Sequence, residues 1–509
     1  DDQVGAERQH AFELGRRTAA GQPPEFRQIG HFRQEQGRFV GAQRARPADQ
    51  LVGRQTVDED RGRCAGRKHA ARYSGKVDPA FGTWDDVRRL GARFDLLADL
   101  MVNHISRRSP YFVDFARHGR ASAYADMFIT LDKVWPSGEP FQADVQRIFL
   151  RRPEHPFTDV TIEETGKTER LWATFGGGVE TPRPPEQIDL DVTSPLAQQF
   201  LKETLRHLQQ QCIRIVRLDA VGYVIKKAGT SCFFIEPELF EFLDELRAYA
   251  QSLGLTLLPE IHAHHTWQAR LAAHGYWVYD FVLPLLVLHT LVTQSSVALQ
   301  TYLARCPRKQ FTMLDCHDGI PVQPDLDDIL TTAESKAVVE RLLQRGANLS
   351  RLHAWEKREG DFDAHQVNIT YYSAVGSDDD AYMAARAIQL FAPGVPQVYY
   401  VGLLAGENDN AAVAQTGERR AINRHNYTLV EIEAAIDKPV VQRLLRLIRF
   451  RNTFPAFKGR VTVRATPADR ISLVWEDGES NCVLDVDLNT CRARVTYREA
   501  GGVDASIDV

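Results

Sequence analysis

The sequence lacks a long apolar run, a strong charge of either sign and a cysteine pattern typical of metal sites. Its longest apolar stretch, residues 281–292, contains Pro284 and His289 and is too short to span a bilayer. The net charge of −5 offers no basic face for nucleic acid. Seven cysteines are scattered without metal-ligand spacing, and no signal peptide is recognisable. We therefore expect a cytoplasmic, reduced protein that binds neither nucleic acid nor membrane.

The first 74 residues differ from the rest of the chain. They contain thirteen arginines but a single lysine, Lys68. Phe26, Phe32 and Phe39 follow neither a two-residue nor a 3.6-residue period, so we expect no core-forming element here. Two interpretations stay open. The segment is either a disordered arm or an out-of-frame translation of a GC-rich gene, joined to the true frame near Lys76.

After Lys76, apolar runs of strand length alternate with helical stretches. We expect strands at 94–104, 213–219, 255–262, 277–284, 311–318 and 395–403, and helices at 84–93, 195–211 and 236–253. Such alternation is typical of parallel βαβ units, and a chain of this length has room for a large barrel with appended domains. Polar residues recur at the carboxyl ends of the expected strands. This pattern predicts an α/β (β/α)8 barrel whose active site lies on that face.

The expected domain organisation follows from interruptions in this alternation. Residues 1–74 are atypical, 75–104 start the barrel, 105–186 form an inserted domain B and 187–318 continue the barrel. An inserted subdomain at 319–365 and the end of the barrel at 366–457 follow. Short alternating segments after residue 458 predict a small antiparallel β domain at 458–509.

Two carboxyl groups close neighbouring expected strands. Asp219 and Glu260 would reach one pocket, and exchange of a glycosidic bond needs one ionised and one protonated carboxyl group. Arg217 points to the same face as Asp219 by strand alternation, and its guanidinium would keep Asp219 ionised and orient it. Glu260 follows Pro259 on a leucine-rich strand, where partial desolvation favours the protonated form that a general acid needs.

Four short motifs carry a family resemblance. Asp99-Leu-Met-Val-Asn103-His104, Arg217-Leu-Asp219, Glu260 and His317-Asp318 follow one another on successive expected strands. In this order and context the chain resembles the α-amylase superfamily of glycosidases and glucosyltransferases. The resemblance implies that Asp219 is the nucleophile, Glu260 the acid/base and Asp318 the stabiliser of the transition state. It also implies that His104 and His317 bind the same glucosyl unit and that Asn103 is structural. No cofactor and no metal, Ca²⁺ included, are expected.

Longer stretches narrow the resemblance. FDLLADLMVNHIS, RLDAVGYVIKKAGTSCFFIEPE, VYDFVLPLLVLHTL, PGVPQVYYVGLLAGEND and INRHNY are similar to the sucrose phosphorylase group, from Lys76 to about Gly459. This implies transfer of an α-glucosyl unit from sucrose to inorganic phosphate with net retention. The same resemblance assigns phosphate binding to Arg151 and Arg152, glucosyl binding to Arg420 and ring stacking to Phe175.

Three departures from the group's pattern qualify this interpretation. The acceptor-side loop reads Asp363-Ala-His365-Gln, where many members have tyrosine at the position of His365. A histidine beside two arginines would suit a phosphorylated ketose, so sucrose 6-phosphate is a rival substrate. The insert at 176–182 is expected to lengthen a loop over the pocket.

The third departure is the start of the chain. Members of the group begin with two barrel strands and an aspartate that pairs with the arginine matched by Arg420, and nothing in residues 1–74 resembles these. The abrupt edge of the resemblance favours the out-of-frame interpretation. A barrel without two strands exposes sheet edges, so we expect this chain to be poorly folded or weakly active.

Other functions share the four motifs. A sucrose hydrolase or a sucrose isomerase would carry them, and a pseudoenzyme created by the altered start of the chain is a further alternative. Retention of Asp219, Glu260 and Asp318 argues against a barrel that has lost its catalytic carboxylates. The sequence leaves the oligomeric state open, and a homodimer is compatible with it.

Overall fold

The computed structural model describes residues 29–32, 77, 81–150, 155–175, 185–323, 326–350 and 362–509. They fall into two compact units, which divide between Ile261 and His262. Within the described residues, every helix is too short or too polar to cross a membrane.

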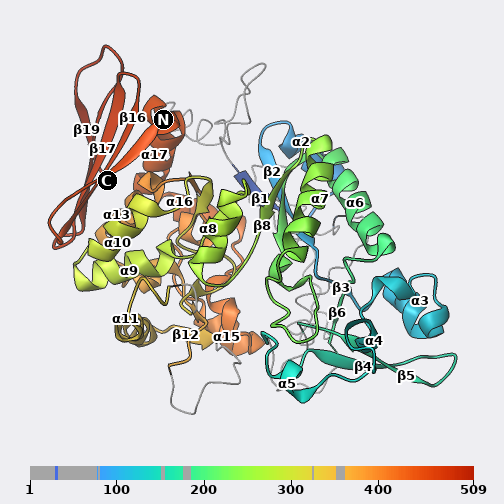
Figure 1. Cartoon of the computed structure of the whole chain (residues 1–509). Helices are drawn as coiled ribbons and strands as arrows, with labels where there is room; N and C mark the ends of the chain where they lie inside the picture. The colour runs from blue at the N-terminus through green and yellow to red at the C-terminus, as the bar shows by residue number, and fades with distance from the viewer. Residues whose placement is uncertain are drawn as a thin grey trace. The chain divides into compact units, whose positions relative to one another are not determined.

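A four-stranded parallel sheet is the centre of the first unit. Its order is β1 (Ile29–Phe32), β2 (Asp95–Met101), β7 (Ile213–Asp219) and β8 (Thr256–Pro259). Helices α2 (Trp84–Gly91), α6 (Pro195–Gln210) and α7 (Glu238–Ser252) pack on β2, β7 and β8, and α6 lies beside α7 (Figure 1). The strands that follow these helices in the chain are largely buried, as expected for a sheet of βαβ units.

Residues 29–32 form a strand within the first 74 residues, where no core-forming element is expected. These residues form β1, which pairs with β2 in parallel, Ile29 opposite Asp95 and Phe32 opposite Ala98. A barrel without its first two strands would leave one edge of β2 unpaired. In the structure, β1 pairs with this edge over four residues. The remainder of the interpretation of residues 1–74 lies outside the described residues.

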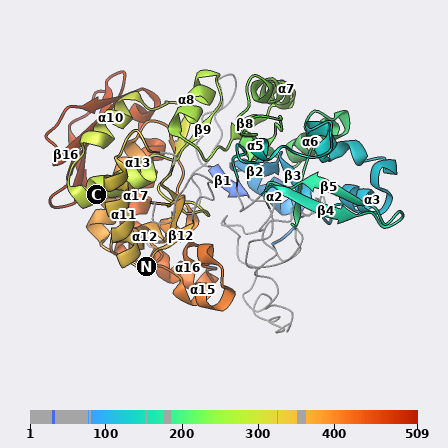
Figure 2. The ribbon, with the colours of Figure 1, turned by 60° about the horizontal axis from the view of Figure 1, so that its bottom comes forward.

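The segment after β2 builds a small subdomain that Figure 2 shows around β4 and β5. Strand β3 (His104–Ser106) pairs antiparallel with β6 (Gln187–Asp189), and β4 (Phe157–Thr161) pairs antiparallel with β5 (Thr168–Trp172). Trp135 and Trp172 stack at 5.7 Å between ring centroids, and both are buried with Phe157 in a local core. The local core packs the middle of the long excursion, and the β3–β6 pairing brings its two ends together.

The second unit contains a three-stranded parallel sheet in the order β14 (Val395–Pro396), β10 (Gln310–Thr312) and β9 (Val278–Asp280). Its helices include α8 (His265–Ala273), α9 (Leu283–Thr293), α10 (Val297–Arg305), α11 (Thr332–Gln344), α13 (Asp379–Phe391) and α17 (Pro439–Thr453). The expected strand at 395–403 is wrong beyond Pro396, because Tyr400–Leu403 form helix α14. The expected strand at 277–284 likewise ends at Asp280, and helix α9 begins at Leu283.

The end of the chain forms a five-stranded antiparallel sheet. Its strands are β15 (Arg460–Arg464), β16 (Arg470–Asp477), β17 (Ser480–Asp487), β18 (Arg492–Arg498) and β19 (Ala505–Asp508), paired in sequence order. The alternating segments from which this domain was expected, at 461–463, 471–475, 482–486 and 493–497, lie in the first four strands. The fifth, β19, was missed because most of its residues are exposed and it has no buried face to mark it. Helix α13 packs against β17 and β18 and joins this sheet to the core of the second unit.

Candidate active site

The first unit brings two predicted catalytic carboxyl groups to one arginine. Arg217 lies on β7, and its Nη1 is 2.9 Å from Oδ1 of Asp219, the last residue of the same strand. Its Nη2 contacts the carboxylate of Glu260, which directly follows β8. The parallel pairing of β7 with β8 explains this placement, because Leu218 lies opposite Pro259 and its carbonyl accepts a hydrogen bond from the Glu260 N–H. The expected pair therefore shares one cation.

A third carboxyl group, from Asp99, also faces this guanidinium. Asp99 lies opposite Arg217 in the β2–β7 register, and its Oδ1 is 3.2 Å from Arg217 Nη1. The side chains of Asp99 and Arg217 are almost wholly buried, whereas Asp219 is 17% exposed. Asp219 is thus the most accessible of the three carboxylates. This is the arrangement that a nucleophile needs, since it must reach a substrate while an arginine holds it ionised.

The surroundings of Glu260 differ from those of Asp219. Glu260 is 7% exposed and follows Leu258 and Pro259, which are buried. Apolar surroundings of this kind are the setting in which enzymes place a general acid.

His104 and Phe175 lie together in the first unit. Their ring centroids are 5.2 Å apart in an edge-to-face arrangement, and Phe175 makes a similar contact with Tyr223 at 5.2 Å. His104 begins β3 and is 3% exposed. Its Nδ1 lies 3.4 Å from the side-chain amide nitrogen, Nδ2, of Asn103. Tyr223, which is also buried, was missed by sequence reasoning, although it lies in the quoted stretch RLDAVGY.

Asn103 takes part in a buried charge cluster. The Lys226 ammonium donates to the Asn103 side-chain oxygen at 2.9 Å and lies 2.8 Å from Asp189 Oδ2. Thr174 donates its hydroxyl to the same carboxylate at 2.5 Å, and Lys226 also lies over the ring of Trp172. The cluster ties the end of β2 to β6 and the segment after β5, so the oxygens of Asn103 and Asp189 are directed at an ammonium group.

In the second unit, Asp318 is surrounded by cationic and imidazole side chains. Arg420 donates to Asp318 Oδ1 at 2.6 Å, and Arg424 lies 3.3 Å from the same oxygen. The imidazole Nε2 of His317 is 3.6 Å from Oδ1, and that of His262 is 3.9 Å from Oδ2. Arg424 and His262 were missed as site residues. Arg424 lies in INRHNY, one of the stretches that carry the family resemblance, four positions after Arg420. The sequence could therefore have identified it as a candidate site residue.

These neighbours determine the ionisation of Asp318. Burial by itself raises the pKa of this carboxyl, but the charges of Arg420, His317, Arg424 and His262 outweigh it and hold the pKa well below its ordinary value. Asp318 is therefore an anion over the whole physiological range. An anion held in this manner can bind sugar hydroxyl groups and stabilise positive charge on a nearby carbon.

The acceptor-side residues His365 and Asp363 lie beside β13 (Gln366–Asn368). The Nδ1 of His365 is 3.0 Å from the carbonyl oxygen of Gln323, a contact that places the proton of a neutral ring on Nδ1. Arg420 also donates to Gln366 Oε1 at 2.7 Å, so it links β13 to Asp318. The predicted phosphate ligands Arg151 and Arg152 lie outside the described residues, as does the insert at 176–182.

The elements and the carboxylates at their ends define a class. Parallel strands alternating with helices, an Arg-x-Asp at the end of one strand and a glutamate at the end of the next are the features of α-amylase-type barrels that act on glycosidic bonds.

Comparison with known proteins narrows the class. No protein-family model matches the chain. It is 53% identical over 428 residues to a sucrose 6(F)-phosphate phosphorylase of Thermoanaerobacterium thermosaccharolyticum, covering 84% of this chain and 87% of the relative. It is 43% identical over 429 residues to a sucrose phosphorylase of Streptococcus mutans, covering 83% and 87%. A crystal structure of a sucrose 6F-phosphate phosphorylase from Thermoanaerobacter thermosaccharolyticum matches with a TM-score of 0.83 at 52% identity, covering 87% of this chain and 89% of that one.

The chain belongs to the sucrose phosphorylase family of α-amylase-type (β/α)8-barrel enzymes. The expected fold class and enzyme class are thereby confirmed.

Proposed function

We propose that this enzyme transfers an α-glucosyl unit from a sucrose-type donor to inorganic phosphate by double displacement, with Asp219 as nucleophile and Glu260 as acid/base. One observation carries the proposal: Arg217, on the strand that ends in Asp219, contacts the carboxylates of Asp219 and Glu260 at once. A shared cation fixes the two groups relative to each other and leaves each a distinct protonation role.

The first displacement forms a covalent glucosyl-enzyme. The Asp219 carboxylate attacks the anomeric carbon while the bond from that carbon to the ketose oxygen breaks, and the Glu260 proton passes to that oxygen. In the second displacement a phosphate oxygen attacks the same carbon and Asp219 departs. Glu260 then takes back a proton from the attacking phosphate. Two inversions give α-glucose 1-phosphate.

Asp318 is proposed to stabilise the positive charge that develops on the sugar ring. Its depressed pKa supports this role, because the group stays ionised throughout catalysis. We propose that His104, His317 and Arg420 bind the glucosyl unit and that Phe175 stacks on it. Phosphate binding by Arg151 and Arg152 is also a proposal, on the chemical ground that a bidentate guanidinium suits phosphate oxygens.

For the donor we propose sucrose 6F-phosphate in preference to sucrose. The support is the higher identity to the relative of that name, 53% against 43% for the sucrose phosphorylase. His365 adds a chemical reason. With Nδ1 directed at the Gln323 carbonyl, its protonated ring would offer Nε2–H to an anionic group.

The test compares phosphate-dependent release of glucose 1-phosphate from the two donors. We expect the larger kcat/KM with sucrose 6F-phosphate, and the His365→Gln variant should lose part of that preference. The exposed His274, 2.9 Å from the Arg270 carbonyl on α8, gives the matched control His274→Gln, which should not change it. A clear preference for unmodified sucrose would remove the donor proposal. Free glucose or an isomer formed without phosphate would instead indicate a hydrolase or an isomerase.

A further inference from the structure

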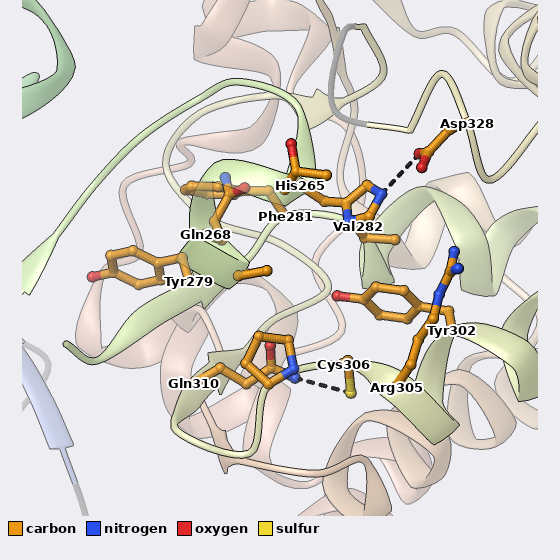
Figure 3. Close-up of a pocket in the computed structure, with 13 residues that line it drawn as sticks. His265, Gln268, Tyr279, Phe281, Val282, Tyr302, Arg305, Cys306, Gln310 and Asp328 are labelled. Atoms are coloured by element: carbon orange, nitrogen blue, oxygen red, sulfur yellow. Dashed lines mark hydrogen bonds and ion pairs between the residues drawn. The ribbon is translucent and has the colours of Figure 1, made fainter. Parts of the chain in front are cut away.

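Two histidines and an aspartate meet at the surface of the second unit, away from Asp318. His264 precedes helix α8 as its N-cap, and His265 is the first residue of that helix. Asp328 comes from the segment before α11 and approaches both rings. Its Oδ1 lies 3.1 Å from His264 Nε2 and 2.8 Å from His265 Nε2. Figure 3 shows the His265–Asp328 contact at one edge of a pocket.

From this geometry we propose that His264, His265 and Asp328 bind a divalent transition-metal ion, with Zn²⁺ as the best match. One ligand atom of each residue lies within 4.8 Å of the others. In a tetrahedral zinc site the ligand atoms stand about 3.3 Å apart, given metal–ligand distances of about 2.0–2.1 Å. The observed separations of 2.8 and 3.1 Å therefore need to open by only a few tenths of an ångström.

The chemistry of the three groups suits such an ion. Imidazole nitrogens and a carboxylate are the ligands that zinc takes besides thiolate. One neighbour disfavours metal binding: the positive charge of the exposed Arg305 acts on His265 and would repel a bound cation.

A supporting contact fixes one of the rings. His264 Nδ1 lies 2.9 Å from Thr266 Oγ1, which directs a proton to Nδ1 when Nε2 binds metal. Hydrogen bonds of this kind orient histidine ligands in zinc sites. Asp328 is 49% exposed, so water can complete the coordination from the open side.

A bound ion would join two segments that are remote in sequence. The loop that carries His264 also carries His262, which faces Asp318, and Asp328 belongs to the segment that leads into α11. The ion would therefore hold the β8–α8 connection and the start of α11 together and raise the thermal stability of the enzyme.

The test uses the full chain, stripped with EDTA and titrated with Co²⁺ and with Zn²⁺. We expect one equivalent of Co²⁺ to bind with the visible absorption of a four- or five-coordinate site, and Zn²⁺ to displace it and to raise the unfolding temperature. His264→Ala and Asp328→Asn should each weaken binding at least about tenfold, whereas His274→Ala at the other end of α8 should not. Absence of stoichiometric binding would overturn the proposal. So would binding that is unchanged in both variants, since the metal would then occupy another place. Turnover is not the readout, so this result is independent of the proposed function.

Discussion

The guanidinium of Arg217 contacts Glu260 through Nη2 while its Nη1 lies 2.9 Å from Asp219. The groups that we propose as nucleophile and acid/base are thus held by a single side chain that is 3% exposed. The β7–β8 pairing produces this relationship, because it places Arg217 opposite Leu258, two residues before Glu260.

Replacement of Arg217 by lysine should lower kcat strongly while the protein remains folded. Lysine keeps the positive charge, but its compact ammonium group replaces a planar guanidinium with two separate Nη donors. It therefore cannot hold Asp219 and Glu260 together. We expect a loss of about 10²–10³-fold in kcat, the range measured for removal of one preorganised donor. Steady-state phosphorolysis beside a circular dichroism spectrum checks this. A variant with near-normal kcat would show that the bridge has no catalytic role.

Glu260→Gln should lose the general acid without losing the nucleophile. We expect a fall of roughly 10²–10⁴-fold in kcat with a ketose leaving group. With α-glucosyl fluoride the leaving group needs no proton, so the first displacement should be much less affected. A pre-steady-state burst of fluoride followed by slow turnover would support this role. Equal losses on both donors would argue that Glu260 acts otherwise.

Lys226→Met should destabilise the first unit. The Lys226–Asp189 pair is almost wholly buried, with side-chain exposures of 2% and 0%. Removal of one partner leaves a buried carboxylate without its cation, which costs about 3–5 kcal/mol in the free energy of unfolding. The double variant Lys226→Met with Asp189→Asn should recover part of the loss. Denaturant unfolding of both variants measures this, and a Lys226→Met protein as stable as the parent would contradict the assignment.

The ionisation of Asp318 should depend on Arg420. Its folded-state pKa lies well below the ordinary value, so its contribution to stability is present above about pH 4 and is lost as the pH falls through the folded pKa. Arg420→Gln removes the largest of the charges that lower this pKa. The acid limb of the kcat/KM profile should then move to higher pH. A profile with an unchanged acid limb would show that Asp318 titration does not limit activity.

The sequence predicted strand β7 to the residue, because Ile213–Asp219 is a largely apolar run of strand length that ends in a polar residue. It also predicted that Arg217 serves Asp219, since both lie on one face of a strand. It did not predict the Arg217–Glu260 contact, which depends on register between strands. Lys226 with Asp189, and Asp328 with His264, were missed for a similar reason: each pair joins segments far apart in sequence, and neither partner has a distinctive local pattern.

The expectation of weak activity stays a prediction. It rests on the finding that nothing in the sequence of residues 1–74 resembles the first two barrel strands of the group, whereas β1 pairs the edge of β2 for four residues. Soluble expression of the full chain with a turnover rate like that of its relatives would refute it.

The most direct test of the double displacement is the anomeric form of the first product. Proton NMR during phosphorolysis of sucrose 6F-phosphate by the full chain should show α-glucose 1-phosphate from the earliest time points, because two inversions at the anomeric carbon, the first by attack of Asp219, give net retention. Initial formation of the β-anomer would mean a single displacement and would contradict the role of Asp219 as nucleophile.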